Sequence, residues 1–378
     1  MPVHDCIVLG VGGVGAATLY HLARRGLRVL GIDRFAPGHD RGSSHGETRV
    51  IRQAYFEHPD YVPLLRKARE LWKDLEARRG ESLYQECGLL QAGPANGVVV
   101  PGVLRSAREH GLAVEELSRA DVQRRFPGFK LAEGMSAVFE RTAGYLRVES
   151  CVRAHAEEAT RAGAQIIVGE AARSWRRAGS GVEVVTDRGA HTAGALVLCP
   201  GAWAPSLLTG LGVPLEVRRK PVAWFQTSSD AYREERGGTC FLFETERGVF
   251  YGFPDLPGSG LKAAEHTGGE PVLDPLTVDR SFRKDEAEVL ASFLREHLPF
   301  VVPQPLRHSV CLYTMSPDEH FIIDRHPDHA AVVFAAGLSG HGFKFTSVLG
   351  AVLADFVADG ATRLPVDFLS LARFRGRS

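Results

Sequence analysis

The chain has 378 residues, of which 44% are hydrophobic and 24% are charged. This is the composition of an ordinary globular protein, and the length suits two or three domains. Lys+Arg and Asp+Glu are balanced at 45 each, so we expect neither nucleic acid nor an anionic membrane surface as a partner. No apolar run reaches the roughly 18 residues of a membrane span.

The two ends of the chain and its cysteines suggest where the protein works. Met1–Asp5 leads directly into an apolar strand, which leaves no room for a signal peptide. Arg375–Ser378 is not a peroxisomal address of the Ser-Lys-Leu type. The six scattered cysteines include no C-x-x-C pair, which argues against a zinc ribbon, a redox dithiol or a disulfide framework. We therefore expect a cytoplasmic protein without a metal.

The first predicted unit is a nucleotide-binding turn. The apolar strand Cys6–Leu9 leads into Gly10–Gly15, and small and apolar residues at helical spacing follow. In such a turn the first glycine permits a tight bend, the second lets the backbone approach a pyrophosphate, and the last allows the helix to pack on the strand. The next strand, Val29–Ile32, ends at Asp33, which is placed to bind a ribose hydroxyl. The alternative is a glycine-rich turn followed by a solvated aspartate.

The middle of the chain mixes helices and short strands. A loop rich in Gly, His and Ser follows Asp33, and helices are predicted over 61–78, 103–110 and 149–162. A strand at Gln165–Val168, a hairpin near 182–186 and a buried strand at Ala195–Leu198 come next, and the last of these ends in a turn at Gly201. Strands at Ala223–Gln226 and Gly248–Phe253 belong to an aromatic-rich region that we expect to be largely antiparallel.

A second glycine-rich turn lies near the C-terminus. The apolar strand Val333–Ala336 runs into a loop with glycines at 337, 340 and 342, and a helix with Lys344 at its start follows. Such a turn points backbone N–H groups and the positive end of a helix dipole at a bound group. We therefore predict an α/β fold, in which a Rossmann-like cofactor domain (1–81, 146–215 and 308–378) is interleaved with a mostly antiparallel α+β substrate domain (82–145 and 216–307).

Several motifs in order along the chain point to one family. They are Gly10–Gly15 with Asp33, the loop Gly42–Arg52, Tyr251–Pro254, Val310–Thr314, Asp318–Asp324 and Gly340–Lys344. With these motifs the chain resembles the monomeric sarcosine oxidase and N-methyltryptophan oxidase family, FAD-dependent amine oxidases of the D-amino-acid-oxidase-like superfamily. The resemblance covers nearly the whole length.

The resemblance implies that FAD is attached covalently to Cys311. A thiolate can attack the flavin if nearby cations stabilise the reduced ring, and the matching cations are His45 and Arg49. Arg49 keeps its charge under these conditions. Without the family context, Cys311 would be interpreted as another buried thiol, like Cys6 and Cys199, and Arg49 as part of a surface salt bridge.

The resemblance also implies a site for a secondary amine that carries a carboxylate. Arg52 and Lys344 match the two carboxylate-binding positions, since a guanidinium offers bidentate geometry and an ammonium a point charge. Lys262 matches the lysine that activates O₂ by stabilising developing negative charge; by itself it would be taken for an exposed lysine. Tyr251 and His266 match further substrate-side positions. For Tyr55, in what looks like a strand, a core role is equally compatible.

The complete set of expected site residues is as follows. The catalytic residues are Lys262, Arg49, His45, Tyr251 and His266, and the substrate-binding residues are Arg52, Lys344, Tyr313, Gly340 and Leu242. The cofactor-binding residues are Gly10, Val11, Gly12, Gly13, Val14, Gly15, Asp33, Arg34, Gly42, Ser43, Ser44, Arg49, Ala172, Gly201, Cys311, Gly337, Gly340, Gly342, Phe343 and Lys344.

At some positions the residue differs from the one that the sarcosine enzymes carry, and these differences leave the size of the substrate open. Ser44 stands where those enzymes commonly have a first histidine, Glu47 where they have aspartate, and Leu242 where they have methionine. The segments around Trp224 and Ser339 look nearer to the N-methyltryptophan oxidases. The sequence thus predicts the reaction type more firmly than the substrate.

The predicted activity is oxidative demethylation of sarcosine or N-methyl-L-tryptophan by a monomer. O₂ is the acceptor, and the products are the primary amino acid, formaldehyde and hydrogen peroxide. One alternative is an oxidase of a cyclic imino acid such as L-pipecolate or L-proline. Another is an NAD(P)-dependent reductase, which would leave Cys311 and the second glycine turn without a role. A third is a flavoprotein that binds or transfers electrons without consuming O₂.

Overall fold

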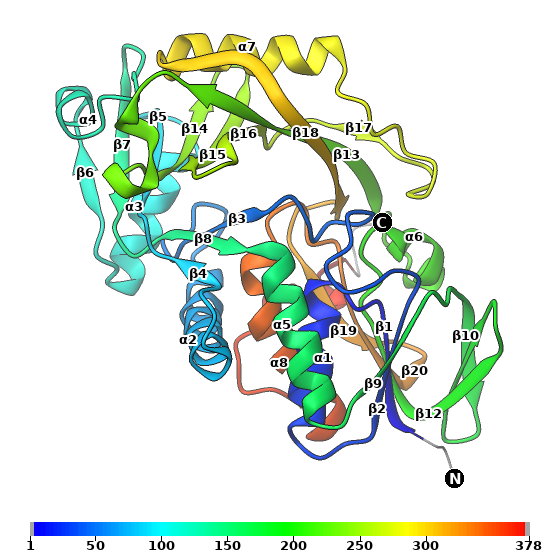
Figure 1. Cartoon of the computed structure of the whole chain (residues 1–378). Helices are drawn as coiled ribbons and strands as arrows, with labels where there is room; N and C mark the ends of the chain where they lie inside the picture. The colour runs from blue at the N-terminus through cyan, green and yellow to red at the C-terminus, as the bar shows by residue number, and fades with distance from the viewer. Residues whose placement is uncertain (1–3, 375–378) are drawn as a thin grey trace.

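The computed structural model describes residues 4–374 and divides them between two domains, with the cofactor-type domain below the second in Figure 1. This confirms the predicted mixed α/β fold with one largely parallel and one largely antiparallel sheet. The expectations drawn from the two chain ends involve residues 1–3 and 375–378, which lie outside the described part.

The lower domain is built on an eight-stranded sheet whose central strands are parallel. Its order is β10-β11-β12-β1-β2-β9, with β20 paired to β12 and β19 to β20. Both faces of the central strands are covered, so their sequences read as continuous apolar runs. The strands are β1 (His4–Leu9), β2 (Val29–Asp33), β9 (Gln165–Val168), β10 (Ala172–Ala178), β11 (Gly181–Thr186), β12 (Ala190–Leu198), β19 (Ile322–His326) and β20 (His329–Ala336).

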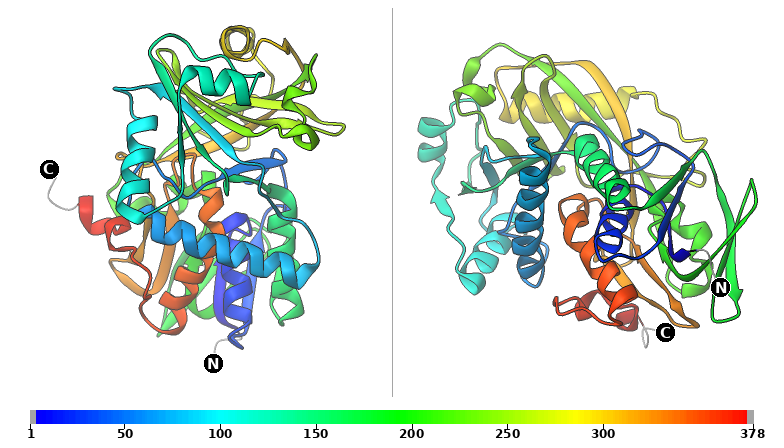
Figure 2. Two further views of the ribbon diagram at one scale, coloured as in Figure 1. Left: turned by 90° about the vertical axis from the view of Figure 1, so that its left-hand side faces the viewer. Right: turned by 60° about the horizontal axis from the view of Figure 1, so that its bottom comes forward.

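Three helices lie side by side against one face of this sheet: α1 (Gly13–Ala23), α5 (Val148–Arg161) and α8 (Thr346–Ala358) (Figure 2). The long helix α2 (Tyr61–Arg79) packs on α8. A Cβ on Gly350 of α8 would lie 2.5 Å from the Cβ of Ala17 in α1. This close approach brings the two glycine-rich turns that precede α1 and α8 to the same edge of the sheet.

The upper domain contains a nine-stranded sheet in the order β17-β13-β16-β15-β14-β5-β7-β6, with β18 paired to β13. All its pairs are antiparallel except β14 with β5, and α7 (Lys284–His297) crosses its outer side (Figure 1). The strands are β5 (Leu89–Pro94), β6 (Glu115–Leu117), β7 (Met135–Glu140), β13 (Glu216–Thr227), β14 (Cys240–Thr245), β15 (Gly248–Leu256), β16 (Gly260–Glu265), β17 (Glu270–Pro271) and β18 (Val301–Met315).

A small sheet of β3 (Thr48–Ile51), β8 (Gly144–Arg147) and β4 (Tyr84–Gln85) carries the chain between the domains. The expected domain boundary at residue 308 falls inside β18, which stays paired with β13 as far as Met315. The remaining helices are α3 (Val99–His110), α4 (Arg119–Arg125), α6 (Ala204–Leu207) and the short 3₁₀ turns Gly201–Trp203, Thr209–Leu211, Asp230–Tyr232, Glu234–Arg236, Phe343–Phe345, Asp367–Leu369 and Leu371–Phe374.

Three details differ from the sequence-based expectations. Helix α3 begins at Val99 rather than Val103, and α4, begun by a Ser118 capping box, was not predicted. Tyr55 does not lie in a strand but in the loop after β3. Within residues 4–374, the structure contains no helix that combines the length and apolar character needed to cross a bilayer.

Candidate active site

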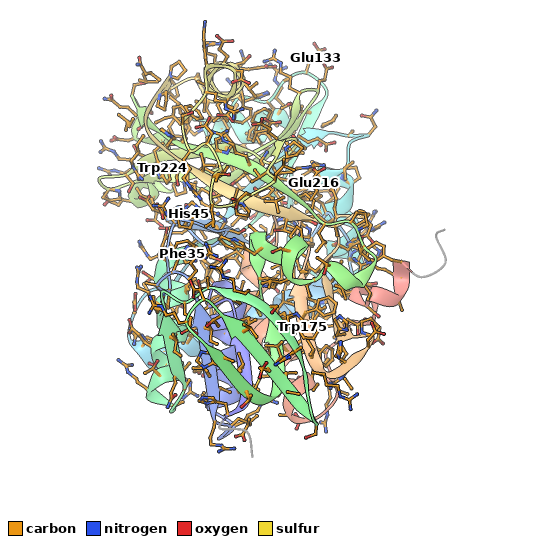
Figure 3. The ribbon with its side chains drawn as sticks, turned by 90° about the vertical axis from the view of Figure 1, so that its right-hand side faces the viewer. Phe35, His45, Glu133, Trp175, Glu216 and Trp224 are labelled. Carbon is orange, nitrogen blue, oxygen red and sulfur yellow. The ribbon has the colours of Figure 1, made fainter. Side chains whose placement is uncertain are left out.

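A cavity of about 210 Å³ opens at the edge where the parallel strands end. The turn after β1, the end of β2, the loop after β12 and the turn after β20 all contribute to its lining. Figure 3 labels Phe35 and His45 at the junction between the domains, below Trp224 of the upper sheet. A crevice at the carboxyl ends of parallel strands is the usual ligand site of an open α/β sheet.

The first glycine turn has no room for side chains. Gly10 has a φ of +88°, and a Cβ there would lie 2.2 Å from the carbonyl oxygen of Cys199. A Cβ on Gly15 would lie 1.7 Å from the carbonyl oxygen of Gly10. The turn can therefore present its backbone to a phosphate group directly.

Asp33 closes the far end of this turn. Its Oδ2 accepts a hydrogen bond from the Val11 N–H at 2.6 Å, and its Oδ1 accepts one from the Phe35 N–H at 2.8 Å. Burial raises the pKa of this carboxyl, although the backbone donors oppose the rise. Asp33 also lines the cavity, so it can both brace the turn and accept a hydrogen bond from a ligand hydroxyl.

The second glycine turn lies opposite the first. Gly337 and Gly340 have φ values of +58° and +79°, and a Cβ on Gly340 would lie 2.2 Å from the Tyr313 ring. Tyr313 comes from β18, so the turn packs directly on the strand that also carries Cys311.

The cavity accounts for most of the expected cofactor residues. Those that line it are Gly10, Gly12, Gly13, Val14, Asp33, Arg34, Gly42, Ser43, Ser44, Arg49, Ala172, Gly201, Gly337, Gly340, Gly342 and Phe343. Val11, Gly15 and Cys311 do not line it, and Lys344 lines a neighbouring cavity instead. Sequence reasoning missed several further residues that carry no motif of their own: Phe35, His39, Glu170, Pro200, Trp203, Leu312, Thr314 and Thr346.

Cys311 lies between a guanidinium and an imidazole. Its sulfur lies 3.1 Å from an Nη of Arg49 and 4.0 Å from Nδ1 of His45. Burial alone would raise the pKa of this thiol, but His45 and then Arg49 outweigh it and lower the pKa to about 5. Cys311 is therefore a thiolate at neutral pH, which is the nucleophilic form.

Lys262 lies on the other side of the same loop. Its Nζ donates to the carbonyl oxygens of Gly46 at 2.5 Å and Thr48 at 2.9 Å, and the side chain is 2% exposed. Burial, followed by repulsion from Arg49, lowers the pKa of Lys262 to about 7. A Cβ on Gly46 would lie within 3.5–3.7 Å of Arg49, Lys262 and Cys311, so these three side chains converge on one point.

The residues around Cys311 fit a flavin. Nε2 of His45 is buried without a hydrogen-bond partner among the described residues, while its Nδ1 faces Ser309 and Cys311. A buried polar atom without a protein partner requires another hydrogen-bonding group, from a ligand or water, to satisfy it. Arg49, which lines the cofactor cavity, connects it to the thiolate.

A second, smaller cavity adjoins the first. The two share Arg49, Tyr313, Gly340 and Phe343 in their linings. The expected substrate-binding residues Arg52, Lys344 and Leu242 line the second cavity together with the expected catalytic residues Tyr251 and His266. Val50, Phe56, Glu57 and His341 line it as well. The fold therefore brings the expected substrate residues together next to the cofactor cavity.

Arg52 has a partner that the sequence reasoning missed. Its guanidinium donates to both oxygens of Glu57, at 2.7 and 2.8 Å, and stacks on the rings of Tyr55 and Phe56. Burial would raise the pKa of Glu57, but Arg52, His341 and Lys344 lower it to about 2. The signal in the sequence that could have indicated this pair is that Arg52 and Glu57, of opposite charge, lie five positions apart in an apolar segment.

Lys344 is almost completely buried in the same cavity wall. Its Nζ donates to the carbonyl oxygen of His341 at 2.8 Å and faces the Tyr55 hydroxyl at 3.5 Å. Burial and then repulsion from Arg52 lower its pKa to about 7. Tyr55 is fully buried and also contacts Nδ1 of His341 at 2.6 Å, so it braces the cation rather than lining the cavity.

His266 and Tyr251 form the opposite wall. Nδ1 of His266 lies 3.5 Å from the Tyr313 hydroxyl, and burial lowers the pKa of His266 to about 4. This imidazole is therefore neutral at pH 7. Burial raises the pKa of Tyr251, which keeps its hydroxyl protonated as a hydrogen-bond donor.

Comparisons with known proteins show the family of the chain. A family model described as FAD dependent oxidoreductase matches residues 5–356. The chain is 41% identical over 371 residues to a monomeric sarcosine oxidase of Streptomyces avermitilis, covering 97% of this chain and 96% of that protein. It is 39% identical over 376 residues to an N-methyl-L-tryptophan oxidase of Yersinia pestis, covering 98% and 100%.

A solved structure supports the same assignment. NikD, described as an unusual amino acid oxidase essential for nikkomycin biosynthesis, is 27% identical and superposes with a TM-score of 0.86 over 98% of each chain. The chain belongs to the FAD-dependent oxidoreductase family and is an FAD-dependent amine oxidase of the sarcosine oxidase type.

Proposed function

We propose that this FAD-dependent oxidase demethylates N-methyl amino acids with O₂, giving the primary amino acid, formaldehyde and hydrogen peroxide. The observation that carries the proposal is the shared wall of the two cavities at Arg49, Tyr313, Gly340 and Phe343. A small amine in the second cavity would lie directly beside a group bound in the first. The relatives named monomeric sarcosine oxidase support a monomer as the working unit.

FAD, when bound, supplies the two-electron acceptor for the amine and passes the electrons to O₂. We assign its covalent attachment to Cys311, because the pKa of this buried thiol is lowered to about 5 beside His45 and Arg49. His45 and Arg49 supply positive charge where negative charge develops. Lys262, buried beside Arg49 and Cys311, is assigned to O₂.

We assign the substrate carboxylate to Arg52 and Lys344, which line the second cavity together. The Arg52 guanidinium donates to both oxygens of Glu57, so a carboxylate ligand must compete with Glu57 or bind beside it. Tyr251 and His266, both uncharged at neutral pH, can orient the amine by hydrogen bonds. Leu242 contributes an apolar wall.

The test is a peroxide-release assay over sarcosine, N-methyl-L-tryptophan, N-methyl-L-alanine, L-pipecolate and L-proline. The proposal expects peroxide and formaldehyde in equal amounts from the N-methyl substrates. Peroxide from pipecolate or proline alone would make the enzyme a cyclic imino acid oxidase. Substrate-dependent reduction of FAD without O₂ consumption would make it a dehydrogenase.

A further inference from the structure

Two cysteines from distant parts of the chain meet where β5 and β14 begin. The sulfur atoms of Cys87 and Cys240 lie 3.7 Å apart, although 153 positions separate them in the sequence. The backbone holds them in place, because the Cys240 N–H donates to the Gly88 carbonyl at 3.2 Å and β14 pairs in register with β5. Within residues 4–374, no other pair of cysteine sulfurs comes within hydrogen-bond distance.

The two thiols have different surroundings. Cys240 is completely buried, and burial raises its pKa well above the usual value. Cys87 is partly exposed, and the hydrogen bond between the two thiols lowers its pKa although burial opposes this. A partly exposed cysteine with a lowered pKa beside a buried thiol with a raised pKa is the arrangement of an oxidisable cysteine and its resolving cysteine.

We propose that Cys87 and Cys240 form a dithiol that hydrogen peroxide converts to an intramolecular disulfide. The Cys87 thiolate attacks one peroxide oxygen, the O–O bond breaks, and the other oxygen leaves and takes up a proton as water. The Cys240 thiol then displaces the hydroxyl group from the Cys87 sulfenic acid, which releases a second water. The two thiols lose two electrons, and the peroxide gains them.

The site lies near the place where the proposed reaction would release peroxide. Cys240 belongs to the same apolar cluster as Cys311, Trp224 and Phe253. The Lys262 ammonium is 4.7 Å from the Phe253 ring and close enough for its charge to act on Cys240. The idea that the enzyme's own peroxide is the oxidant rests on the proposed function.

The first experiment is independent of that function. Reduced protein, freed of reductant, is exposed to added hydrogen peroxide and then analysed by thiol titration and peptide mapping. The proposal expects a Cys87–Cys240 crosslinked peptide pair and the loss of both of these thiols. In Cys87→Ser the Cys240 thiol should not be lost. The control is Cys151→Ser, which replaces a buried cysteine with no neighbouring thiol and should crosslink like the parent. Oxidation of Cys87 to sulfinic acid without a crosslink, or no thiol loss, would overturn the proposal.

A stability measurement provides a second readout. The crosslink closes a long loop, so the oxidised parent should unfold several degrees above the reduced parent. Cys240→Ala should show no difference between oxidising and reducing conditions. An equal melting temperature in both states of the parent would contradict the crosslink.

The last experiment separates the two proposals. An N-methyl amino acid is turned over in air by the reduced enzyme, with and without excess catalase. A crosslink that forms during turnover despite catalase shows that peroxide reaches the pair from within the molecule. If turnover releases peroxide but no crosslink forms, the enzyme's own peroxide is not the oxidant of the pair. If added peroxide forms the crosslink but no substrate yields peroxide, only the proposed function is overturned.

Discussion

The guanidinium of Arg49 lies 3.1 Å from the sulfur of Cys311, and 262 positions of sequence separate them. Arg49 comes from β3 of the small linking sheet, and Cys311 from β18 of the upper sheet. The packing of the small linking sheet against the upper sheet therefore creates the charge environment of the thiolate. Neither residue would have an unusual pKa by itself.

Replacing Cys311 should abolish covalent flavin. Cys311→Ala removes the ionised thiol, so acid precipitation should leave the FAD in the supernatant, whereas the parent's yellow colour should stay in the pellet. Cys151→Ala is the matched control, because that thiol is also buried but donates to the Leu83 carbonyl oxygen, and burial raises its pKa. Colour in the pellet of Cys311→Ala would show that another residue carries the attachment.

Lys262→Met should slow the reaction with O₂ selectively. Anaerobic reduction by substrate is expected to stay within about tenfold of the parent, while reoxidation slows by at least about 10²-fold, the scale of losing one preorganised charge. Stopped-flow spectroscopy measures the two half-reactions separately. Equal slowing of both would indicate a structural defect instead of an oxygen-specific role.

The same lysine predicts a pH dependence. Burial and Arg49 lower the pKa of Lys262 to about 7, so its ammonium is charged below that pH and loses its proton as the pH rises through it. The reoxidation rate of the parent should therefore fall above pH 7. The rate of Lys262→Met should be flat over the same range; a parallel fall in both proteins would assign the titration to another group.

Lys344→Met should weaken the binding of carboxylate inhibitors such as methylthioacetate. The loss is expected to be about 2–5 kcal/mol, because the buried carboxylate of the ligand loses one of the two cations assigned to it. Titration of the flavin spectrum measures the Kd without catalysis. Unchanged affinity would place the carboxylate site outside the second cavity.

Glu57→Gln should have the opposite effect on the same ligands. Removing the resident carboxylate frees Arg52, so inhibitor affinity should rise about tenfold, the scale of a charge-assisted hydrogen bond. The substitution should also change acid stability. The folded-state pKa of Glu57 is lowered from 4.5 to about 2, so its contribution to stability is present above pH 4.5 and is lost as the pH falls towards 2.

Acid denaturation of the parent and Glu57→Gln tests this second effect. The difference between their free energies of unfolding should shrink steadily below pH 4.5. A difference that does not vary with pH would show that the ion pair with Arg52 contributes no net charge stabilisation. Tighter inhibitor binding without the acid effect would still support competition between Glu57 and the ligand.

Gly340→Ala should disrupt the site through Tyr313. Gly340 and Gly134 have nearly equal φ values, +79° and +78°, but a Cβ at 340 would lie 2.2 Å from the Tyr313 ring while one at 134 would meet open space. Gly134→Ala should therefore lose only about 1 kcal/mol of stability. Gly340→Ala should lose bound flavin and activity as well; similar behaviour of the two variants would show that backbone strain alone acts.

The sequence by itself determined the local structural motifs of this protein. The glycine turn at Gly10–Gly15, the acid at Asp33 and the apolar strands around them depend on interactions within about thirty residues, so their patterns are visible in the chain. The parallel lower sheet and the antiparallel upper sheet followed from the same periodicities. Resemblance to a family then indicated which separate segments form one site.

Only the tertiary structure decided which charges meet and in which state. The ionised thiol of Cys311, the near-neutral pKa of Lys262 and the pairing of Arg52 with Glu57 arise from burial and from neighbours on other segments. The sequence did not predict the contact between Cys87 and Cys240 either. The wide spacing of the cysteines argued against a dithiol, whereas the β5–β14 pairing places the two sulfurs together. Coulomb forces and desolvation depend on distance in space, which sequence separation does not encode.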